Sequence, residues 1–125
     1  MAGDELSALT QRILALAIEV HRNLGPGLLE SIYEAALCVE LQTSGLQFER
    51  QKILPVFYKG HAIGEFRIDL LVEDTVLLEL KSVDRHDPVF EAQVISYLRI
   101  SGVRLGLLIN FNAPLLKDGV RRFIN

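Results

Sequence analysis

The spacing of apolar residues divides the chain into helical and extended segments. From about residue 4 to residue 24, apolar side chains recur every three or four positions, which predicts an amphipathic helix that Asp4 caps and Gly25 ends. The same spacing predicts a second helix over about residues 27–44. Gly45 follows it, in the left-handed position that glycine favours at a helix end.

The middle of the chain has the pattern of β-strands. Residues 46–60 are strand-like, and Pro55 predicts a break, a bulge or an edge position there. Two apolar runs, at 66–72 and 76–81, predict adjacent strands joined by a turn at residues 73–75. These strands are expected to form antiparallel hairpins.

A third helix is predicted over residues 88–101, with Asp87 as its cap and Pro88 at its first position. A buried strand over 104–110 follows, and then a loop around Pro114 and a short basic tail. The expected order is α-α-β-β-β-α-β in a single domain over 1–125. Because a helix separates the last two strands, they are expected to be parallel, in an α/β (α+β) fold whose mixed central sheet is flanked by helices.

Composition and charge narrow the setting of the protein. Hydrophobic residues make up 50% of the 125, yet no apolar run reaches the roughly 18–20 residues of a membrane span. The N-terminus lacks the pattern of a secretory signal, and the single cysteine, Cys38, fits a small core residue, so we expect a cytoplasmic protein. Net charge is −3, but residues 92–125 hold five basic residues against Asp118 alone, a net +4. That basic end could meet phosphates or could be a solvated helix face.

Three charged residues on the two central strands carry the chemistry: Asp69, Glu79 and Lys81. Strand side chains alternate between faces, so each strand is predicted to place its charged residues on one face. A three-residue turn would pair Val72 with Val76 and set Asp69 opposite Glu79, with Arg67 facing Lys81. Two carboxylates so close favour a cation between them.

This arrangement fits phosphodiester hydrolysis assisted by Mg²⁺, with Mn²⁺ as a substitute, because both ions prefer oxygen ligands. Asp69 and Glu79 would hold the ion, with the carbonyl of Leu80 as a third ligand, and Lys81 would position the attacking water. The alternative is a charged cluster on a solvated sheet face, which is common in proteins.

The run Gly27–Tyr33, together with the sequences FRIDLLVED, LLELKSV, EAQVISYL and GLLINF, resembles the GxxExxY proteins of the PD-(D/E)XK nuclease-like superfamily. The resemblance implies a restriction-endonuclease-like core in which Asp69, Glu79 and Lys81 form the site. It also implies that Glu30 approaches the metal and that Gln93 and Tyr97 contact phosphate or support Lys81. Phe90 is a departure, at a position where relatives commonly carry histidine.

Each implied residue also has a structural interpretation. Glu30 could favour the positive end of a helix dipole, Tyr33 could be a packing residue with a tethered hydroxyl, and Gln93 and Tyr97 could be a hydrogen-bonded pair. The leading hypothesis is a Mg²⁺-dependent nuclease acting on DNA or RNA, with a homodimer or a partner protein supplying further grip. The alternative hypothesis is a non-catalytic module that keeps the nuclease fold for nucleic-acid binding or assembly.

Overall fold

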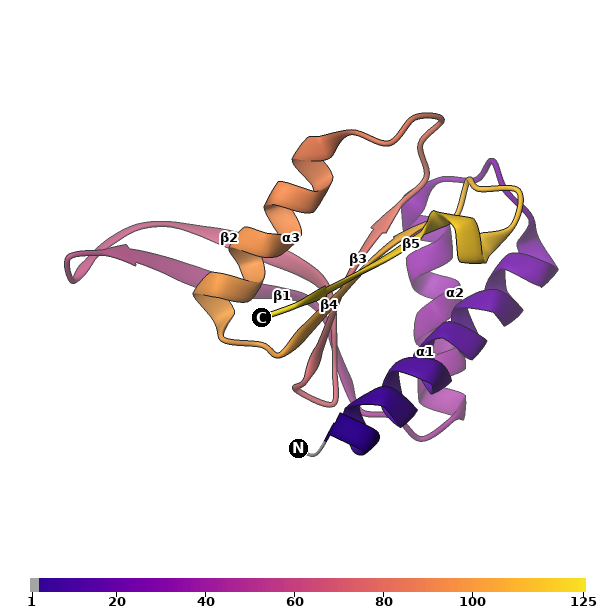
Figure 1. Cartoon of the computed structure of the whole chain (residues 1–125), viewed down its shortest axis with the longest axis horizontal. Coiled ribbons are helices and arrows are strands. Elements are labelled where there is room, and N and C mark those ends of the chain that lie inside the picture. The colour runs from indigo at the N-terminus through magenta and orange to yellow at the C-terminus, as the bar shows by residue number, and fades with distance from the viewer. Residues whose placement is uncertain (1–2) are drawn as a thin grey trace.

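A five-stranded sheet in the order β1-β2-β3-β4-β5 forms the centre of the molecule, and the computed structural model describes residues 3–125 (Figure 1). The elements in chain order are α1 (Gly3–Leu24), α2 (Glu30–Thr43), β1 (Phe48–Tyr58), β2 (His61–Val72), β3 (Val76–Lys81), α3 (Pro88–Ser101), β4 (Leu105–Asn110), the 3₁₀ turn η1 (Leu116–Gly119) and β5 (Val120–Ile124). The prediction of one domain over 1–125 includes Met1 and Ala2, which lie outside the described residues.

The strand directions confirm the expected topology. β2 pairs antiparallel with β1 on one side and with β3 on the other. β3 and β4 are parallel and are joined through α3. β5 was expected to be only a basic tail, but it pairs antiparallel with β4 and forms one edge of the sheet. β1 forms the other edge, which accommodates Pro55 because an edge strand can lack one N–H.

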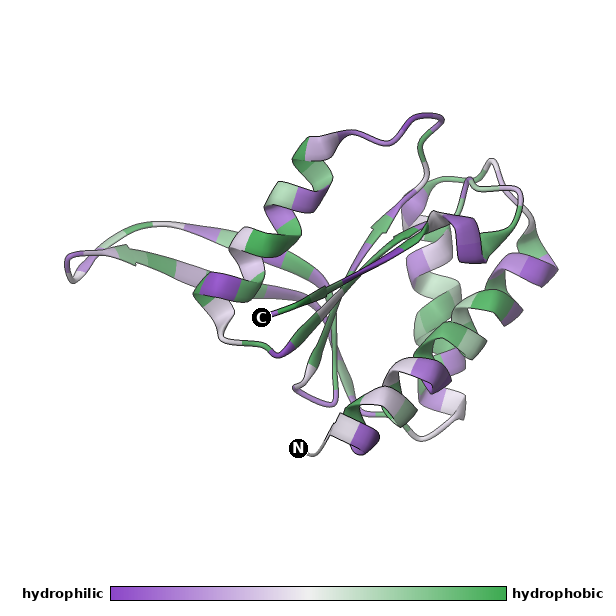
Figure 2. Ribbon diagram, viewed as in Figure 1, coloured by the Kyte–Doolittle hydropathy of each residue, from purple (hydrophilic) through white to green (hydrophobic). Residues whose placement is uncertain are grey.

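Two apolar cores lie on opposite faces of the sheet (Figures 1 and 2). The larger core joins α1 and α2 to one face, with Ile13, Leu37 and Leu78 fully buried in it. The smaller core joins α3 to the other face through Val94 and Leu98. The sheet is thus the middle layer, between α1 and α2 on one face and α3 on the other.

Helix boundaries differ from the prediction at two starts. α2 begins at Glu30 rather than near Gly27, because Gly27 has φ 97° and Leu29 is extended. Asp4 lies inside the first turn of α1 instead of capping it. The start of α3 is as predicted: the Asp87 side chain accepts the Val89 N–H at 2.9 Å, and Pro88 opens the helix.

The structural interpretation of Tyr33 is confirmed. Its ring is fully buried and stacks on Phe111 at 4.6 Å between centroids. Its hydroxyl donates to the Gly25 carbonyl at 2.6 Å and accepts the Leu28 N–H at 3.1 Å. Tyr33 therefore fixes the loop between α1 and α2.

The β1–β2 hairpin projects from the rest of the molecule as a long two-stranded arm (Figure 1). We define the arm as residues 52–67, from which only Leu54 and Phe66 pack against the smaller core. Among residues 3–125, no helix has the length and apolar character needed to cross a membrane.

Candidate active site

The side-chain alternation of β2 is interrupted at Asp69. Ile68 belongs to the core on the α3 face, and Leu70 belongs to the core on the α1–α2 face, although strict alternation would put both on one face. Opposite Asp69 on β1, Gln51 has φ 54°, a left-handed backbone that non-glycine residues rarely adopt. The prediction of strict alternation through Asp69 is therefore wrong, because this irregularity re-aims the chain next to the carboxylate.

The predicted register holds for the turn but ends before the acidic pair. Val72 pairs with Val76, and the β2–β3 ladder continues only to Leu70 and Leu78. Because that ladder stops before Arg67 and Lys81, the predicted pair between these two residues is not part of it.

Beyond the end of that ladder, Asp69 and Glu79 are joined by side-chain hydrogen bonds. The Asp69 N–H donates to Oε1 of Glu79 at 3.2 Å. The Leu80 N–H in turn donates to Oδ2 of Asp69 at 2.9 Å. The two carboxylates thus converge on the same few backbone atoms, as the prediction required.

Glu79 is an unusual acid because it is buried, with 8% of its surface exposed. Burial above all, and the neighbouring Asp69 charge in addition, raise the pKa of the Glu79 carboxyl to about 8. The protein without a cation therefore holds a proton at this pair near neutral pH.

Glu34 of α2 joins this site through Gln51, a connection that the sequence analysis missed. The Gln51 amide donates to Glu34 at 2.6 Å and to Oδ1 of Asp69 at 3.3 Å. Arg50 bonds the other oxygen of Glu34 at 2.6 Å. Glu34 is only 7% exposed, so it is a buried acid held by one amide and one guanidinium. The only sequence signal for it is an acidic residue one helical turn after Glu30.

Lys81 lies at the end of β3 beneath the start of α3. Its ammonium nitrogen is 4.5 Å from the centre of the Phe90 ring, a cation–π contact. The Lys81 carbonyl accepts the Phe111 N–H at 2.8 Å, which fixes its backbone to the chain after β4. Phe90, the departure noted in the sequence, thus contacts the lysine itself.

Tyr97 faces the acidic pair from α3. Burial raises the pKa of its hydroxyl, and the charges of Glu79 and Asp69 raise it as well. The phenol therefore lies within the electrostatic influence of both acids. Its ring stacks on Phe66 of β2 with centroids 4.4 Å apart. Gln93, one turn earlier, is exposed, so its predicted role in contacting phosphate stays a prediction.

Glu30 is exposed at the first position of α2. Its neighbours Leu29 and Ile32 line a hollow together with Ser82 and Asp84, which follow Lys81 in the chain. α2 therefore carries two acids, Glu34 buried beside Gln51 and Glu30 exposed at the first position, and the approach of Glu30 to a metal stays a prediction.

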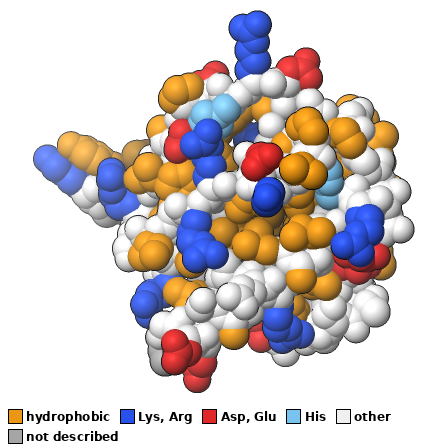
Figure 3. Space-filling model, turned by 45° about the vertical axis from the view of Figure 1, so that its right-hand side comes forward, with side chains coloured by type: hydrophobic (Ala, Val, Ile, Leu, Met, Phe, Trp, Pro, Cys, Tyr) orange, Lys and Arg blue, Asp and Glu red, His pale blue; other side chains and the backbone are white. Residues whose placement is uncertain are grey.

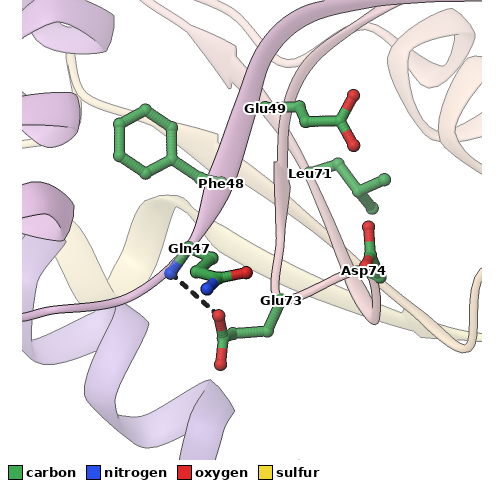
Figure 4. A pocket seen from close by; sticks show the side chains of 6 residues that line it. All are labelled: Gln47, Phe48, Glu49, Leu71, Glu73 and Asp74. Carbon is green, nitrogen blue, oxygen red and sulfur yellow. Dashed lines mark hydrogen bonds between the residues drawn. The ribbon is translucent and has the colours of Figure 1, made fainter.

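Another small pocket lies at the opposite end of the β2–β3 hairpin (Figure 4). Its carboxylates belong to Glu49, Glu73 and Asp74, and Glu73 accepts the Gln47 N–H at 2.8 Å. That bond ties the start of β1 to the hairpin turn. None of the predicted site residues lines this pocket.

The family comparison agrees with this arrangement of strands and helices. A family model described as the PD-(D/E)XK nuclease superfamily matches residues 7–123. The chain belongs to the PD-(D/E)XK nuclease superfamily. A comparison with curated proteins found no match. The match covers almost all of this PD-(D/E)XK chain.

Members of this superfamily typically depend on a metal ion, and the residues here fit one in their chemistry. Asp69 and Glu79 supply hard oxygen donors, and Mg²⁺ keeps several waters, so one or two carboxylates suffice. The proton that the buried pair retains is the charge that a cation would replace. Within the described part of the chain, however, no group of three or more His, Cys, Asp or Glu side chains is placed to share an ion.

Proposed function

We propose that this PD-(D/E)XK protein hydrolyses phosphodiester bonds of DNA or RNA with the help of Mg²⁺, for which Mn²⁺ can substitute. The observation that carries the proposal is the hydrogen-bonded convergence of Asp69 and Glu79, with Leu80 between Glu79 and Lys81. The Gly27–Tyr33 signature further supports a place among the GxxExxY proteins. These motif residues come from separate elements: the signature from α2 and the loop before it, and Asp69 and Glu79 from β2 and β3.

Asp69 and Glu79 would bind the ion, with the Leu80 carbonyl as a third protein ligand and Glu30 reaching it through water. When bound, the ion supplies a water of lowered pKa and offsets charge on the reacting phosphate. Lys81 then orients the attacking water and stabilises its developing hydroxide.

The surrounding residues keep these groups in position. The Gln51 amide restrains the Asp69 carboxylate, and Glu34 restrains Gln51. The Phe90 ring limits where the Lys81 ammonium can lie. Gln93 and Tyr97 contact the phosphate backbone of the substrate from α3.

Cleavage assays test the proposal directly. We expect labelled single- and double-stranded DNA and RNA, incubated with Mg²⁺ or Mn²⁺, to reveal at least one substrate that is cut. Glu79→Gln and Lys81→Ala should each lower the rate by about a hundredfold or more, because each removes a group that acts on the reacting atoms. Glu5→Gln, an exposed acid at the start of α1, serves as the matched control and should cut like the wild type. Cutting that survives unchanged in both site variants would refute the assignment.

A second function is favoured by one observation, the lack of a three-ligand group among residues 3–125. It is a non-catalytic nuclease-fold module that binds nucleic acid or assembles with a partner protein or a second copy. Salt-sensitive binding without turnover, at equal affinity in EDTA and in Mg²⁺, would support this second function and exclude the first.

A further inference from the structure

The projecting arm combines exposed apolar side chains with positive charge. Phe57, Tyr58 and Ile63 surround its tip and are 62%, 59% and 62% exposed. An isolated two-stranded hairpin is at best marginally stable in water. Large apolar side chains on such an arm therefore indicate a surface that is covered in use.

Charge distinguishes the arm from the rest of the chain. Residues 52–67 contain Lys52, Lys59 and Arg67 against Glu65, a net +2, while the whole chain carries −3. The Lys59 ammonium lies 5.4 Å from the centre of the Tyr58 ring, so a cation and an aromatic face occupy the tip together. Figure 3 shows basic and hydrophobic side chains side by side on the projecting part of the molecule.

We propose that the arm is the binding track for a single-stranded segment of nucleic acid that leads to the Asp69–Glu79 pair; this rests on the proposed function. Exposed aromatic rings stack on unpaired bases, and lysine and arginine contact the phosphates between them. A duplex keeps its bases stacked on one another and offers the rings of Phe57 and Tyr58 no open base. The occupant is therefore a strand with unstacked bases.

β2 connects the tip of the arm to the site without interruption. Asp69 lies nine positions after Gly60, and at about 3.3 Å per residue that distance is up to roughly 30 Å. A stacked strand rises ~3.4 Å per nucleotide, and a strand with unstacked bases is more extended, so that length corresponds to at most about nine nucleotides. This number lies within the roughly 4–16 nucleotides that single-strand-binding folds occupy.

Contact between the arms of two copies is disfavoured by symmetry. A two-fold contact brings the same net-positive patch of both partners together, so the two arms repel each other overall. A strand of phosphates offers Lys59 and Arg67 an opposite charge. The strand is thus the better complement to the arm.

Binding without turnover tests the track independently of catalysis. In EDTA, with Glu79→Gln present in every protein, we would measure fluorescence anisotropy of labelled single strands of 6, 12 and 20 nucleotides, in DNA and RNA versions, and of matched duplexes. We expect single strands to bind at least tenfold more tightly than duplexes, with most of the gain in affinity reached by 12 nucleotides. The DNA and RNA arms of the experiment identify which strand is preferred.

Two sets of variants locate the binding on the arm. Phe57→Ala with Tyr58→Ala should weaken binding at least tenfold, and Lys59→Gln or Arg67→Gln should reduce the slope of log affinity against log salt by about 0.7 each. Val39→Ala and Arg22→Gln, exposed on α2 and α1, should change neither quantity. All these side chains are exposed, and thermal melting confirms that each variant is folded.

Absence of single-strand binding overturns the inference, as do unchanged affinity and salt slope in the arm variants. A shift of the tip variant from dimer to monomer at unchanged affinity also overturns it and makes the arm a self-association surface. Arm-dependent binding by a protein that cuts nothing supports the track while the proposed catalysis fails. Cutting that ignores the arm variants leaves the catalysis standing and removes the track.

Discussion

The backbone N–H of Asp69 donates to the carboxyl group of Glu79 at the point where the β2–β3 ladder has ended. A side chain therefore replaces a carbonyl as the acceptor that an ordinary antiparallel pair would provide. The strands separate enough to leave both acids beside one another, and Glu79 stays buried. The cost of this geometry is a carboxyl group that resists ionisation.

Stability should fall as pH rises from about 4.5 to about 8. The unfolded chain loses the Glu79 proton near its ordinary pKa of 4.5, whereas the folded chain keeps it until the pH reaches its raised pKa of about 8. Over that window the folded state binds more protons, so the free energy of unfolding decreases with pH, by on the order of a few kcal/mol.

Glu79→Gln carries no such proton and retains an acceptor for the Asp69 N–H. Urea unfolding at pH 5, 7 and 9 should show the variant becoming more stable relative to the wild type as pH rises, with the change complete above about 8. Glu5→Gln is the control. A stability difference between Glu79→Gln and wild type that stays constant from pH 5 to pH 9 would contradict the raised pKa.

The stabilisation of the protein by a bound metal ion should increase with pH, opposite to the trend of the metal-free protein. Mn²⁺ must displace the proton held at Glu79, so its binding strengthens as pH rises from 6 to 8.5. A ligand that binds only the folded state adds RT ln(1 + [L]/Kd), about 2.7 kcal/mol at one hundred times Kd. Thermal melting with millimolar Mn²⁺ should therefore show a larger increase in Tm at pH 8.5 than at pH 6. Glu79→Gln should abolish most of that increase, and a shift that the variant retains would place the ion elsewhere.

Separate replacements of the two α2 acids, Glu34 and Glu30, distinguish an acid that stabilises the fold from one that serves the site. Glu34→Gln removes the charge that Arg50 and Gln51 bind and should cost about 1–3 kcal/mol. Glu30→Gln changes an exposed side chain and should stay within about 0.5 kcal/mol. Urea denaturation measures both, and cleavage assays on the folded proteins show which acid serves the site. Equal stability losses would mean that the Glu34 network contributes nothing.

Local sequence signals predicted much of this fold. The three-residue turn gave the Val72–Val76 register, and Asp87-Pro88 gave the start of α3. The helix between β3 and β4 predicted their parallel pairing. Each of these features is encoded within a short stretch of chain, by turn length, capping chemistry or the length of a connection.

The unpredicted features depend on residues distant in sequence or on unusual backbone. Gln51 has a left-handed φ that its residue type does not predict. Its side chain bonds to Glu34 and Asp69, which are 17 and 18 residues away in the sequence. Strict alternation could not reveal that β2 changes faces at Asp69. β5 is only five residues long and carries two arginines, so its pattern resembles a polar tail.

Gly106 should be intolerant of a larger side chain because α3 packs directly on β4 there. A Cβ at this position would lie 2.8 Å from Cγ1 of Val94 and 3.2 Å from Cδ1 of Leu98. Gly106→Ala should therefore cost about 1–3 kcal/mol by overpacking. The double variant Gly106→Ala/Val94→Ala should recover part of the loss relative to Val94→Ala alone. Gly3→Ala, with open space around its Cβ, is the control, and an equal effect of both alanines would exclude the packing explanation.

Tyr33→Phe should loosen the loop between α1 and α2 without disturbing the ring stack on Phe111. Both the Gly25 carbonyl and the Leu28 N–H bond to the hydroxyl that this variant removes. The variant therefore leaves the carbonyl without its donor and the N–H without its acceptor. Removing one partner from such bonds costs about 1–3 kcal/mol. Urea unfolding should record that loss, and hydrogen exchange should quicken at the Leu28 amide. Tyr58→Phe, on the exposed tip of the arm, should change neither measurement, so a loss of the same size in both variants would show that the Tyr33 hydroxyl has no special role.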